Sequence, residues 1–465
     1  HQIIDSIMVE VGDYQVNGSS FSSYPYLSIS DYNMGKISHC ETRCWFNASL
    51  LSAIGIPCAV DFVPAWGNRN GAHEWNVLLS AGKIYPFEGI GGIKGKWKCA
   101  QVYNNVWVDE YWMKSRLPKV FRHTFESIQV GPSTNSKSTS LNTPAHLLNP
   151  KIKDVSDQYF QASDLEIPIK YGKPYHDKEY AYLFVFNNNA WVPVFWGVIN
   201  NKKALFSKMG RDIVYLPGFY ENGSVIPFND PFILHHDGSV VYLKSSGTTI
   251  DSVVIERKYY ERPDVGLWRE WNEGAYVEIA DNAQFNNAER IFEIPKCKSY
   301  MNYWDLPQSV DVRYIRYVFP EHRDVLAELK FLSEDRESLV GKQLFSSQLI
   351  GREVEKLFDD NPLSYADLVK TDSMFTWVGF DFGKKTRIKT IGVCPRNDEN
   401  NIIKGEEYEL FYWDNVWISL GRKIAEQYTL KYDNAPNNAL LMIRHTSKGK
   451  ENRIFTWENQ TQKWW

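Results

Sequence analysis

The sequence lacks any run of about eighteen apolar residues, so it predicts no membrane-spanning helix. It also lacks an excess of either charge, because 52 basic and 56 acidic residues are mixed along the chain and give a formal net charge of −4. Nucleic acids and anionic membranes are bound by basic patches, so neither is expected as a partner. The six cysteines are too few and too scattered for a disulfide framework or a paired zinc motif, and we expect no metal and no cofactor.

Aromatic residues are what the chain has in excess. They make up 15% of its 465 residues and include 17 Trp and 27 Tyr. Rings in such numbers suit the cores of β-sandwiches, and they also suit surfaces that stack on sugar rings. The length exceeds what one hydrophobic core serves, so the sequence predicts about three domains.

Composition divides the chain into five ranges. Residues 1–130 have a mixed α/β pattern, and the polar, Ser- and Thr-rich residues 131–144 predict a linker. Short alternating strands separated by Gly, Asn, Asp and Pro then run to the end of the sequence. They predict β-sandwiches over residues 145–246, 247–334 and 335–465. The expected fold class is therefore multidomain, with an α+β domain followed by all-β domains of the sandwich or jelly-roll type.

Cys40 lies at the start of a predicted helix. Ser38 and Glu41 have the spacing of a capping box, and apolar residues then recur at helical intervals until Gly55. The free N–H groups and the dipole of a helix N-terminus stabilise both a thiolate and an oxyanion. Cys40 is therefore a candidate nucleophile, with an inert buried thiol as the alternative. Cys44, one turn later, is expected to be a packing residue.

Two strands predicted after this helix carry an imidazole and a carboxylate. The first strand alternates so that His73 and Trp75 share one face. A tight turn at Gly82 then returns the chain antiparallel towards Glu88. With a two-residue loop, Glu88 pairs with Trp75 and lies diagonal to His73, whereas a register shifted by two places it directly opposite. Either register lets Glu88 orient an imidazole that pairs with a thiolate.

This pattern resembles the transglutaminase-like superfamily, in which a Cys at a helix start is followed by Gly-Ile-Pro, then by His-x-Trp and an acid. The resemblance covers residues 1–130 and implies a papain-like, transglutaminase-like thiol domain. It further implies that Cys40 is the nucleophile, His73 the base and Glu88 the orienting acid. The family usually has Asp in a Trp-containing strand, so Glu88 is a departure from its pattern.

Three further residues are candidates for lining the substrate cleft: Trp66, Trp75 and Asn76. Trp66 also offers an indole N–H to an oxyanion, although core packing explains both tryptophans equally well. A metal site built from His39, Cys40, Cys44 and His73 is a weaker alternative, because these cysteines have no matching second pair.

The later ranges resemble coagulation factor 5/8 (discoidin-like) domains, which are jelly rolls that often bind sugars. The resemblance applies to residues 247–334 and, most clearly, to residues 335–465. The thiol domain and these later domains together resemble secreted transglutaminase-domain proteins of Bacteroides-type gut bacteria. This implies an extracellular, periplasmic or outer-membrane surface location, and a chain starting at His1 without Met indicates processing or a fragment.

Aromatic and acidic residues in the last range have both a structural and a binding interpretation. Sandwich packing is expected to explain most of four tryptophans that also suit sugar stacking: Trp413, Trp417, Trp464 and Trp465. An acidic turn is expected at residues 359–361, with calcium binding as the alternative.

The expected function is a secreted cysteine-dependent hydrolase or acyltransferase that cleaves an amide bond in a peptide, glycopeptide or polysaccharide-associated substrate through a Cys40 thioester. The peptide:N-glycanase branch of the superfamily has the same spacing. One alternative is a non-catalytic surface protein that binds glycans or proteins, with a vestigial thiol domain. Another is an amine-incorporating transglutaminase, which predicts hydrophobic, water-excluding surroundings for His73. An enzyme requires an accessible, low-pKa Cys40, whereas a binding protein tolerates a buried or disulfide-bonded one.

Overall fold

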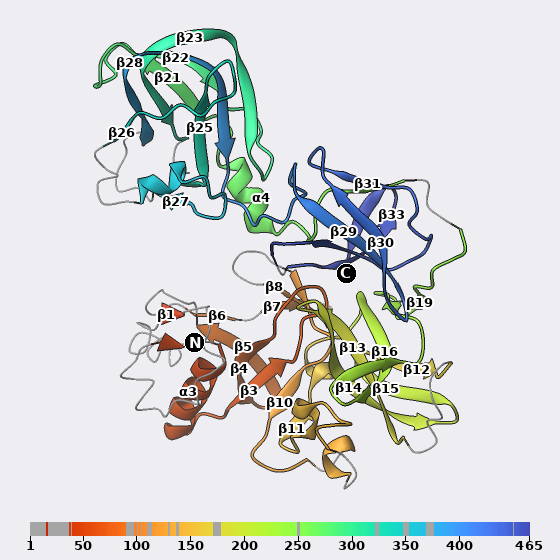
Figure 1. Cartoon of the computed structure of the whole chain (residues 1–465). Helices are drawn as coiled ribbons and strands as arrows, with labels where there is room; N and C mark the ends of the chain where they lie inside the picture. The colour runs from red at the N-terminus through yellow and green to blue at the C-terminus, as the bar shows by residue number, and fades with distance from the viewer. Residues whose placement is uncertain are drawn as a thin grey trace. The chain divides into compact units, whose positions relative to one another are not determined.

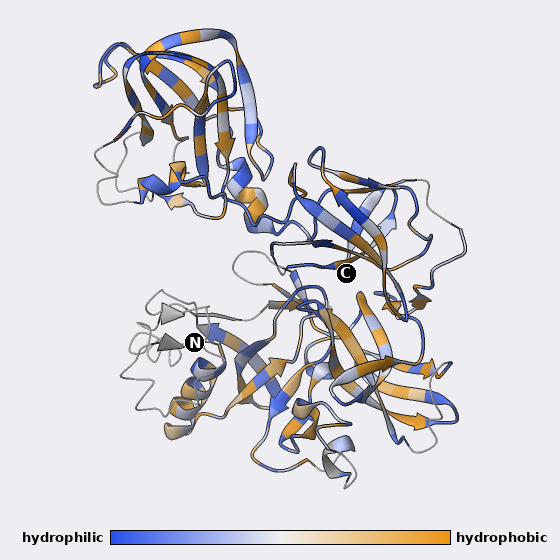
Figure 2. Ribbon diagram, viewed as in Figure 1, coloured by the Kyte–Doolittle hydropathy of each residue, from blue (hydrophilic) through white to orange (hydrophobic). Residues whose placement is uncertain are grey.

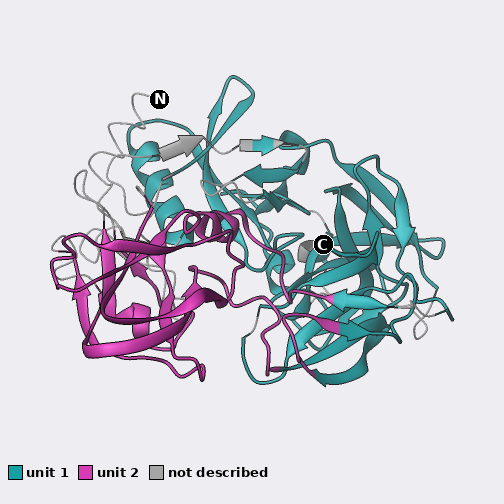
Figure 3. Cartoon of the chain, turned by 90° about the horizontal axis from the view of Figure 1, so that it is seen from above, with its two compact units in different colours: residues 1–254, 407–423, 431–465 teal, residues 255–406, 424–430 magenta. Residues whose placement is uncertain are grey.

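The computed structural model describes residues 15–16, 37–38, 40–89, 97–99, 101–103, 105–108, 114–128, 131–135, 139–170, 178–248, 252–320, 325–346, 353–368, 376–449 and 451–465. The chain divides into two compact units, which Figure 3 distinguishes by colour. Unit 1 comprises residues 1–254, 407–423 and 431–465, and unit 2 comprises residues 255–406 and 424–430. None of the described helices is both long and apolar enough to cross a membrane.

The predicted fold class is wrong. A papain-like α+β domain followed by β-sandwiches was expected, but strands account for 49% of the chain and helices for 10%. The described residues contain two α-helices, α3 (Cys40–Ala53) and α4 (Pro263–Glu270). The physical reason is the hydrophobic pattern, which has helical spacing in α3 and then, apart from α4, consists mainly of short alternating or continuously apolar segments typical of strands. The molecule is thus mostly β, and the β-sandwich-like character expected of the later ranges holds for the chain at large.

The candidate site lies on a six-stranded sheet of unit 1 with the order β11-β10-β3-β4-β5-β6. Its strands are β3 (Cys58–Val63), β4 (His73–Ser80), β5 (Lys83–Gly89), β6 (Trp97–Cys99), β10 (Phe121–His123) and β11 (Ile152–Asp154). Two smaller sheets contain β7 (Gln101–Tyr103), β8 (Val106–Val108) and β9 (Lys114–Arg116), and the parallel pair β1 (Gln15–Val16) and β2 (Ile37–Ser38).

Helix α3 packs beside strands β3, β4 and β5 of this sheet (Figure 1). Leu51 of the helix contacts Phe87 of β5, and Ala48 packs with Val60 of β3. The helix ends where predicted, because Gly55 adopts φ of +79° and its N–H donates to the carbonyl of Ser52 at 3.0 Å. Cys40 lies in the first turn of the helix, as predicted, but α3 begins at Cys40 itself and Ser38 belongs to strand β2, so Ser38 is not the helix cap that the sequence predicts.

Unit 1 contains two further sheets, of eight and five strands. The first has eight strands: β12 (Ser163–Pro168), β13 (Tyr180–Asn187), β14 (Ala190–Asn200), β15 (Lys203–Met209), β16 (Ile213–Glu221), β17 (Ser224–Pro227), β18 (Phe232–Leu234) and β19 (Val240–Tyr242). The second has five strands: β29 (Glu407–Asp414), β30 (Val416–Ile424), β32 (Leu441–His445), β33 (Ile454–Glu458) and β34 (Thr461–Trp464). One buried core contains side chains of both sheets together with Phe62 and Phe121.

Unit 2 is built around the long antiparallel pair β23 (Asn302–Val318) and β28 (Trp377–Cys394). Hydrophobic and hydrophilic residues alternate along both strands (Figure 2), as expected for strands with one buried face. Four more strands complete this sheet: β21 (Tyr276–Ala280), β22 (Glu289–Glu293), β25 (Glu328–Leu332) and β26 (Lys342–Phe345). A short pair consists of β24 (Val325–Leu326) and β27 (Ala366–Asp367), and β20 (Val253–Ile255) and β31 (Leu430–Tyr432) lie at the unit boundaries.

The predicted domain ranges stay predictions, but the sheets connect several of them. Strand β11, which follows the predicted linker, pairs with β10 and so belongs to the sheet of the candidate site. Within the linker, Thr143 is 2% exposed and its hydroxyl bonds the phenol of Tyr182 at 3.2 Å. In unit 2, β23 and β28 come from the two ranges predicted as discoidin-like.

Candidate active site

The β4–β5 hairpin has the geometry that the sequence predicts. Ser80 pairs with Lys83 across a two-residue loop, in which Ala81 and Gly82 both have positive φ. Asn76 pairs with Phe87 at the far end of this register, so the next positions place Glu88 beside Trp75 and diagonal to His73. The diagonal alternative is therefore the one that the structure adopts.

The structure brings together Cys40, His73 and Glu88, the three predicted catalytic residues. The Nε2 atom of His73 lies 2.7 Å from Oε2 of Glu88, and the imidazole also hydrogen-bonds the thiol of Cys40. Cys40 is partly exposed and is a free cysteine. An imidazole held between a thiol and a carboxylate is the arrangement that a thiol nucleophile requires.

Electrostatics at this site favour the charged pair of thiolate and imidazolium. Burial raises the pKa of the Cys40 thiol, but the hydrogen bond and charge of His73 and a hydrogen bond from the backbone of Glu74 outweigh it, so the pKa is lowered. Burial lowers the pKa of His73, but its hydrogen bonds with Cys40 and Glu88 and their charges raise it to about 9. Both shifts act in the same sense, because each favours the proton on His73 and the charge on the sulfur of Cys40.

Three indole rings surround the imidazole of His73. Trp66 and Trp75 lie nearly parallel to it, with centroids at 5.9 and 6.0 Å, and Trp107 meets it edge-on at 5.5 Å. All three tryptophans are almost fully buried. Aromatic faces attract a cation, so the rings of Trp66 and Trp75 favour the imidazolium, and all three buried rings limit its contact with water. Trp107 is not among the residues predicted for the site, because nothing in the sequence around it indicates that it lies near His73.

Asn76 has a different position from the one expected of a cleft-lining residue. It is 1% exposed, and its amide group donates to the carbonyl of Cys44 at 2.8 Å and accepts from Asn47 at 3.0 Å. Both partners lie in α3, so Asn76 joins β4 to the helix that begins with Cys40. Trp66 and Trp75 are likewise buried, at 2% and 0% exposed, and contact His73 rather than open solvent.

Cys44 shows the packing role expected of it. It is 3% exposed and lies in an apolar cluster with Ala48 and Val60, and burial raises the pKa of its thiol well above the ordinary value. The described residues contain no group of three metal-ligating side chains that could hold an ion. His39, a member of the alternative metal site, lies outside the described residues. Among the described thiols, Cys40 is thus the one with a lowered pKa.

Comparisons of the chain with protein-family models, curated proteins and solved structures find no match. The relation to transglutaminase-like enzymes and to discoidin-like domains therefore rests on the motifs of the sequence.

A buried network of Asp61, Arg122 and Tyr159 is hydrogen-bonded to Trp75, one of the rings beside His73. Arg122 of β10 donates two hydrogen bonds to Asp61 of β3, at 2.7 and 2.8 Å, and the phenol of Tyr159 donates to the same carboxylate at 2.6 Å. Tyr159 in turn accepts the indole N–H of Trp75 at 2.8 Å. Burial raises the pKa of Asp61, and Arg122 and Tyr159 oppose that shift. The network connects the ring beside His73 to two strands and to a residue beyond the predicted linker.

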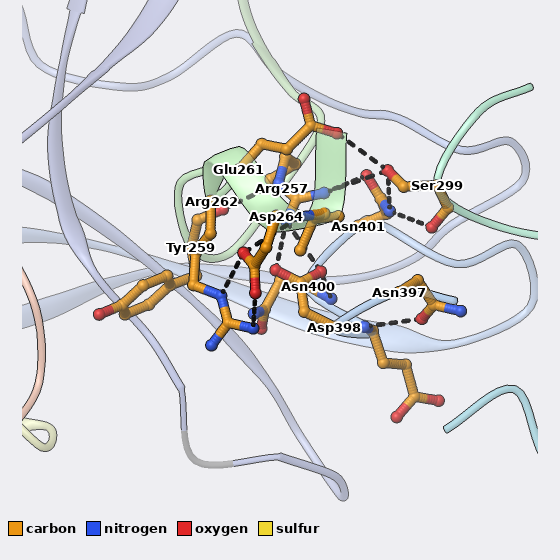
Figure 4. Close-up of polar contacts among 12 residues, drawn as sticks. Arg257, Tyr259, Glu261, Arg262, Asp264, Ser299, Asn397, Asp398, Asn400 and Asn401 are labelled. Carbon is orange, nitrogen blue, oxygen red and sulfur yellow. Dashed lines mark hydrogen bonds and ion pairs between the residues drawn. The ribbon is translucent and has the colours of Figure 1, made fainter. Parts of the chain in front are cut away.

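Unit 2 contains a second buried polar cluster, centred on Arg257. Arg257 forms a two-bond ion pair with Asp398, at 2.7 and 2.9 Å, and donates to Asn401 at 2.8 Å (Figure 4). The amide of Asn401 donates to the carbonyl of Ser299 at 2.7 Å. Arg257 is 9% exposed, and these groups satisfy one another. The cluster joins three segments of unit 2 and has the character of a structural core element.

The aromatic and acidic residues of the last range also have clear positions. Trp413 and Trp465 lie in the core of unit 1, at 7% and 2% exposed, as the packing interpretation expects. Trp417 packs against that core and against the ring of Trp413 at 5.0 Å. In unit 2, Asp359 accepts hydrogen bonds from the backbone N–H of Asn361 and from a serine hydroxyl, which is the geometry of an acidic turn.

Proposed function

We propose that this protein is a cysteine-dependent enzyme of acyl transfer that forms a thioester at Cys40. The observation that carries the proposal is the position of His73, between the thiol of Cys40 and the carboxylate of Glu88 at 2.7 Å. The lowered pKa of Cys40 and the raised pKa of His73 supply a nucleophile and a general acid at the same pH. Cys40 is a free thiol, which the alternative of a vestigial binding domain does not require.

The chemistry follows from these positions. The Cys40 thiolate attacks the carbonyl carbon of an amide, and the negative oxygen that develops accepts hydrogen bonds from free N–H groups at the start of α3. His73 gives its proton to the leaving amine, and the C–N bond breaks to leave a thioester on sulfur. Neutral His73 then takes a proton from water or an incoming amine as that nucleophile attacks the thioester. Glu88 holds the imidazole in place through both steps.

The expected substrate is an amide in a peptide, glycopeptide or polysaccharide-associated polymer, and this part of the proposal rests on the motifs of the sequence. Hydrolysis is the first candidate for the second step. Transfer to an amine is a second candidate, and the three buried indole rings around His73 favour it because they limit the access of water. Glycan binding by the later β-sheets and an extracellular or periplasmic location also stay predictions.

The experiment uses an activated nitrophenyl ester as an acyl donor of low selectivity. We expect a burst of nitrophenol, an acyl group on Cys40 in the mass spectrum of the intact protein, and the loss of both in Cys40→Ser. Cys44→Ser is the matched control, because its thiol is buried and lies outside the catalytic group, and it should retain the burst. Adding a primary amine then distinguishes hydrolysis from transfer. If the thioester breaks down faster and an amide forms, the enzyme transfers the acyl group to the amine. Acylation at another residue, or none, would contradict the proposal.

A further inference from the structure

The loop that precedes His73 is hydrogen-bonded to strand β13 of unit 1, which is more than 100 residues away in the sequence. This loop, residues 66–71, carries Trp66 at one end and leads into β4 at the other. Asn187, the last residue of β13, contacts it through every polar atom of its side chain. The amide of Asn187 donates to the carbonyls of Arg69 and Gly71, at 3.2 and 2.9 Å, and its oxygen accepts the N–H of Gly71 at 2.9 Å.

Several other contacts fix the same loop. It closes on itself through a hydrogen bond from the N–H of Trp66 to the carbonyl of Gly71 at 3.1 Å, with Gly71 at φ of +93°. Arg453, which is fully buried, donates to the carbonyl of Gly67 at 2.6 Å. Gly67 packs so closely on Ile213 that a Cβ atom there would lie 2.4 Å from that side chain. The loop is thus pinned at both ends, with Asn187 holding the end next to the site.

The position of Asn187 has a direct consequence for the imidazole. Gly71, which it holds with two hydrogen bonds, is two residues before His73. Trp66, whose N–H is bonded to that same Gly71, has its ring 5.9 Å from the ring of His73. Movement of this end of the loop therefore displaces the imidazole, the indole beside it, or both. A displacement of about 1 Å is enough to weaken a catalytic hydrogen bond.

We infer that Asn187 is a positioning residue of the candidate active site, acting through the loop of residues 66–71 on His73. Asn187 is 3% exposed and belongs to the eight-stranded sheet, so that sheet completes the thiol site rather than serving as an independent domain. The inference rests on the proposed function, because it concerns the pairing of His73 with Cys40.

The test compares two buried asparagines of the same sheet region. Asn187→Ala removes the three hydrogen bonds to the loop. Asn229→Ala is the matched control, because Asn229 is 0% exposed and bonds the backbone of Pro168 and Asp230 at 2.8 Å, in contacts that do not involve the loop. Asn187→Ser is measured in parallel, since its shorter hydroxyl side chain keeps one acceptor. The readout is the rate of iodoacetamide labelling at Cys40 as a function of pH, together with the melting temperature.

We expect each alanine variant to lower the melting temperature by about 2–4 °C, because each loses buried hydrogen bonds. Only Asn187→Ala should shift the pH profile, with labelling at pH 6 slower by about tenfold, as one unit of pKa implies. Suppose that labelling of the wild type depends on His73, but that Asn187→Ala and Asn187→Ser label with the same pH profile as the wild type. The role of Asn187 would then be refuted, while the proposed function would stand. A wild-type profile that does not depend on His73 would instead overturn the proposed function.

Discussion

Trp75 donates its indole N–H to the phenol oxygen of Tyr159 at 2.8 Å, although the two residues are 84 positions apart in the sequence. Tyr159 also donates to the buried carboxylate of Asp61 at 2.6 Å. The ring of Trp75 faces His73, so this pair joins the candidate active site to a charged group inside the protein. The relationship shows that the site depends on residues beyond the predicted linker.

Tyr159→Phe should lower the free energy of unfolding by about 1–3 kcal/mol, because it leaves the N–H of Trp75 and one oxygen of Asp61 buried without this partner. Urea unfolding followed by tryptophan fluorescence measures the change. Tyr412→Phe, at a half-buried tyrosine of β29, is the control and should change the free energy by less than about 0.5 kcal/mol. Equal losses in the two variants would show that the hydroxyl of Tyr159 has no special role.

Glu88→Gln should lower the pKa of His73 from about 9 towards its ordinary value, since it removes the carboxylate charge 2.7 Å from Nε2. A weaker imidazolium stabilises the thiolate less, so the pKa of Cys40 should rise at the same time. The pH range in which both groups are charged therefore narrows from both sides. NMR titration of the His73 ring protons measures the first effect directly. An inflection that stays near pH 9 would exclude Glu88 as the partner that sets the charge of His73.

Asp398→Asn should destabilise unit 2 by about 3–5 kcal/mol, because it removes the carboxylate charge that pairs with the buried guanidinium of Arg257. Hydrogen exchange across residues 255–406 measures this loss. Arg387→Gln is the matched control: its ion pairs with Asp311 and Glu334 are exposed and screened by solvent, so this variant should exchange at nearly the wild-type rate. Similar effects for the two variants would refute the structural importance of the Arg257 cluster.

Glu328 should make the stability of unit 2 depend on pH. Burial raises the pKa of its carboxyl to about 8, and the carboxylate of Asp359 adds to the rise while Lys330 opposes it. The folded state holds this proton more tightly than the unfolded chain, where the pKa is 4.5. The stabilisation that the proton provides is therefore complete below pH 4.5 and is lost as the pH rises through 8.

Glu328→Gln replaces the protonated carboxyl with a neutral group of the same shape. Urea unfolding at several pH values should show the wild-type free energy falling between pH 4.5 and 8 relative to this variant. If the two proteins keep a constant difference across that range, Glu328 does not hold its proton in the folded state.

The sequence predicted the local parts of the candidate site well. The helical spacing placed Cys40 in the first turn of α3, although Ser38, the predicted cap, lies in strand β2. The Ala81-Gly82 turn set the register that brings Glu88 towards His73. These features depend on residues close together in the chain, where spacing alone determines geometry. The catalytic role of the three residues is a prediction that the geometry supports and that activity measurements must test.

The fold class and the support of the site could not be predicted in the same way. One well-marked helix led to an α+β expectation, although the pattern that follows it alternates with period two. Asp61 and Asn187 carry no sequence signal of their function, because their partners lie 61 and 116 residues away. The first contact forms only when β10 pairs with β3, and the second only when the end of β13 meets the loop before β4.

The pH dependence of iodoacetamide labelling at Cys40, with sites mapped by mass spectrometry in the wild type and in His73→Ala, tests the central claim most directly. The account predicts fast labelling of Cys40 below about pH 7 that slows by about tenfold or more in His73→Ala. Slow labelling that is identical in the two proteins, or labelling that favours Cys44, would contradict it.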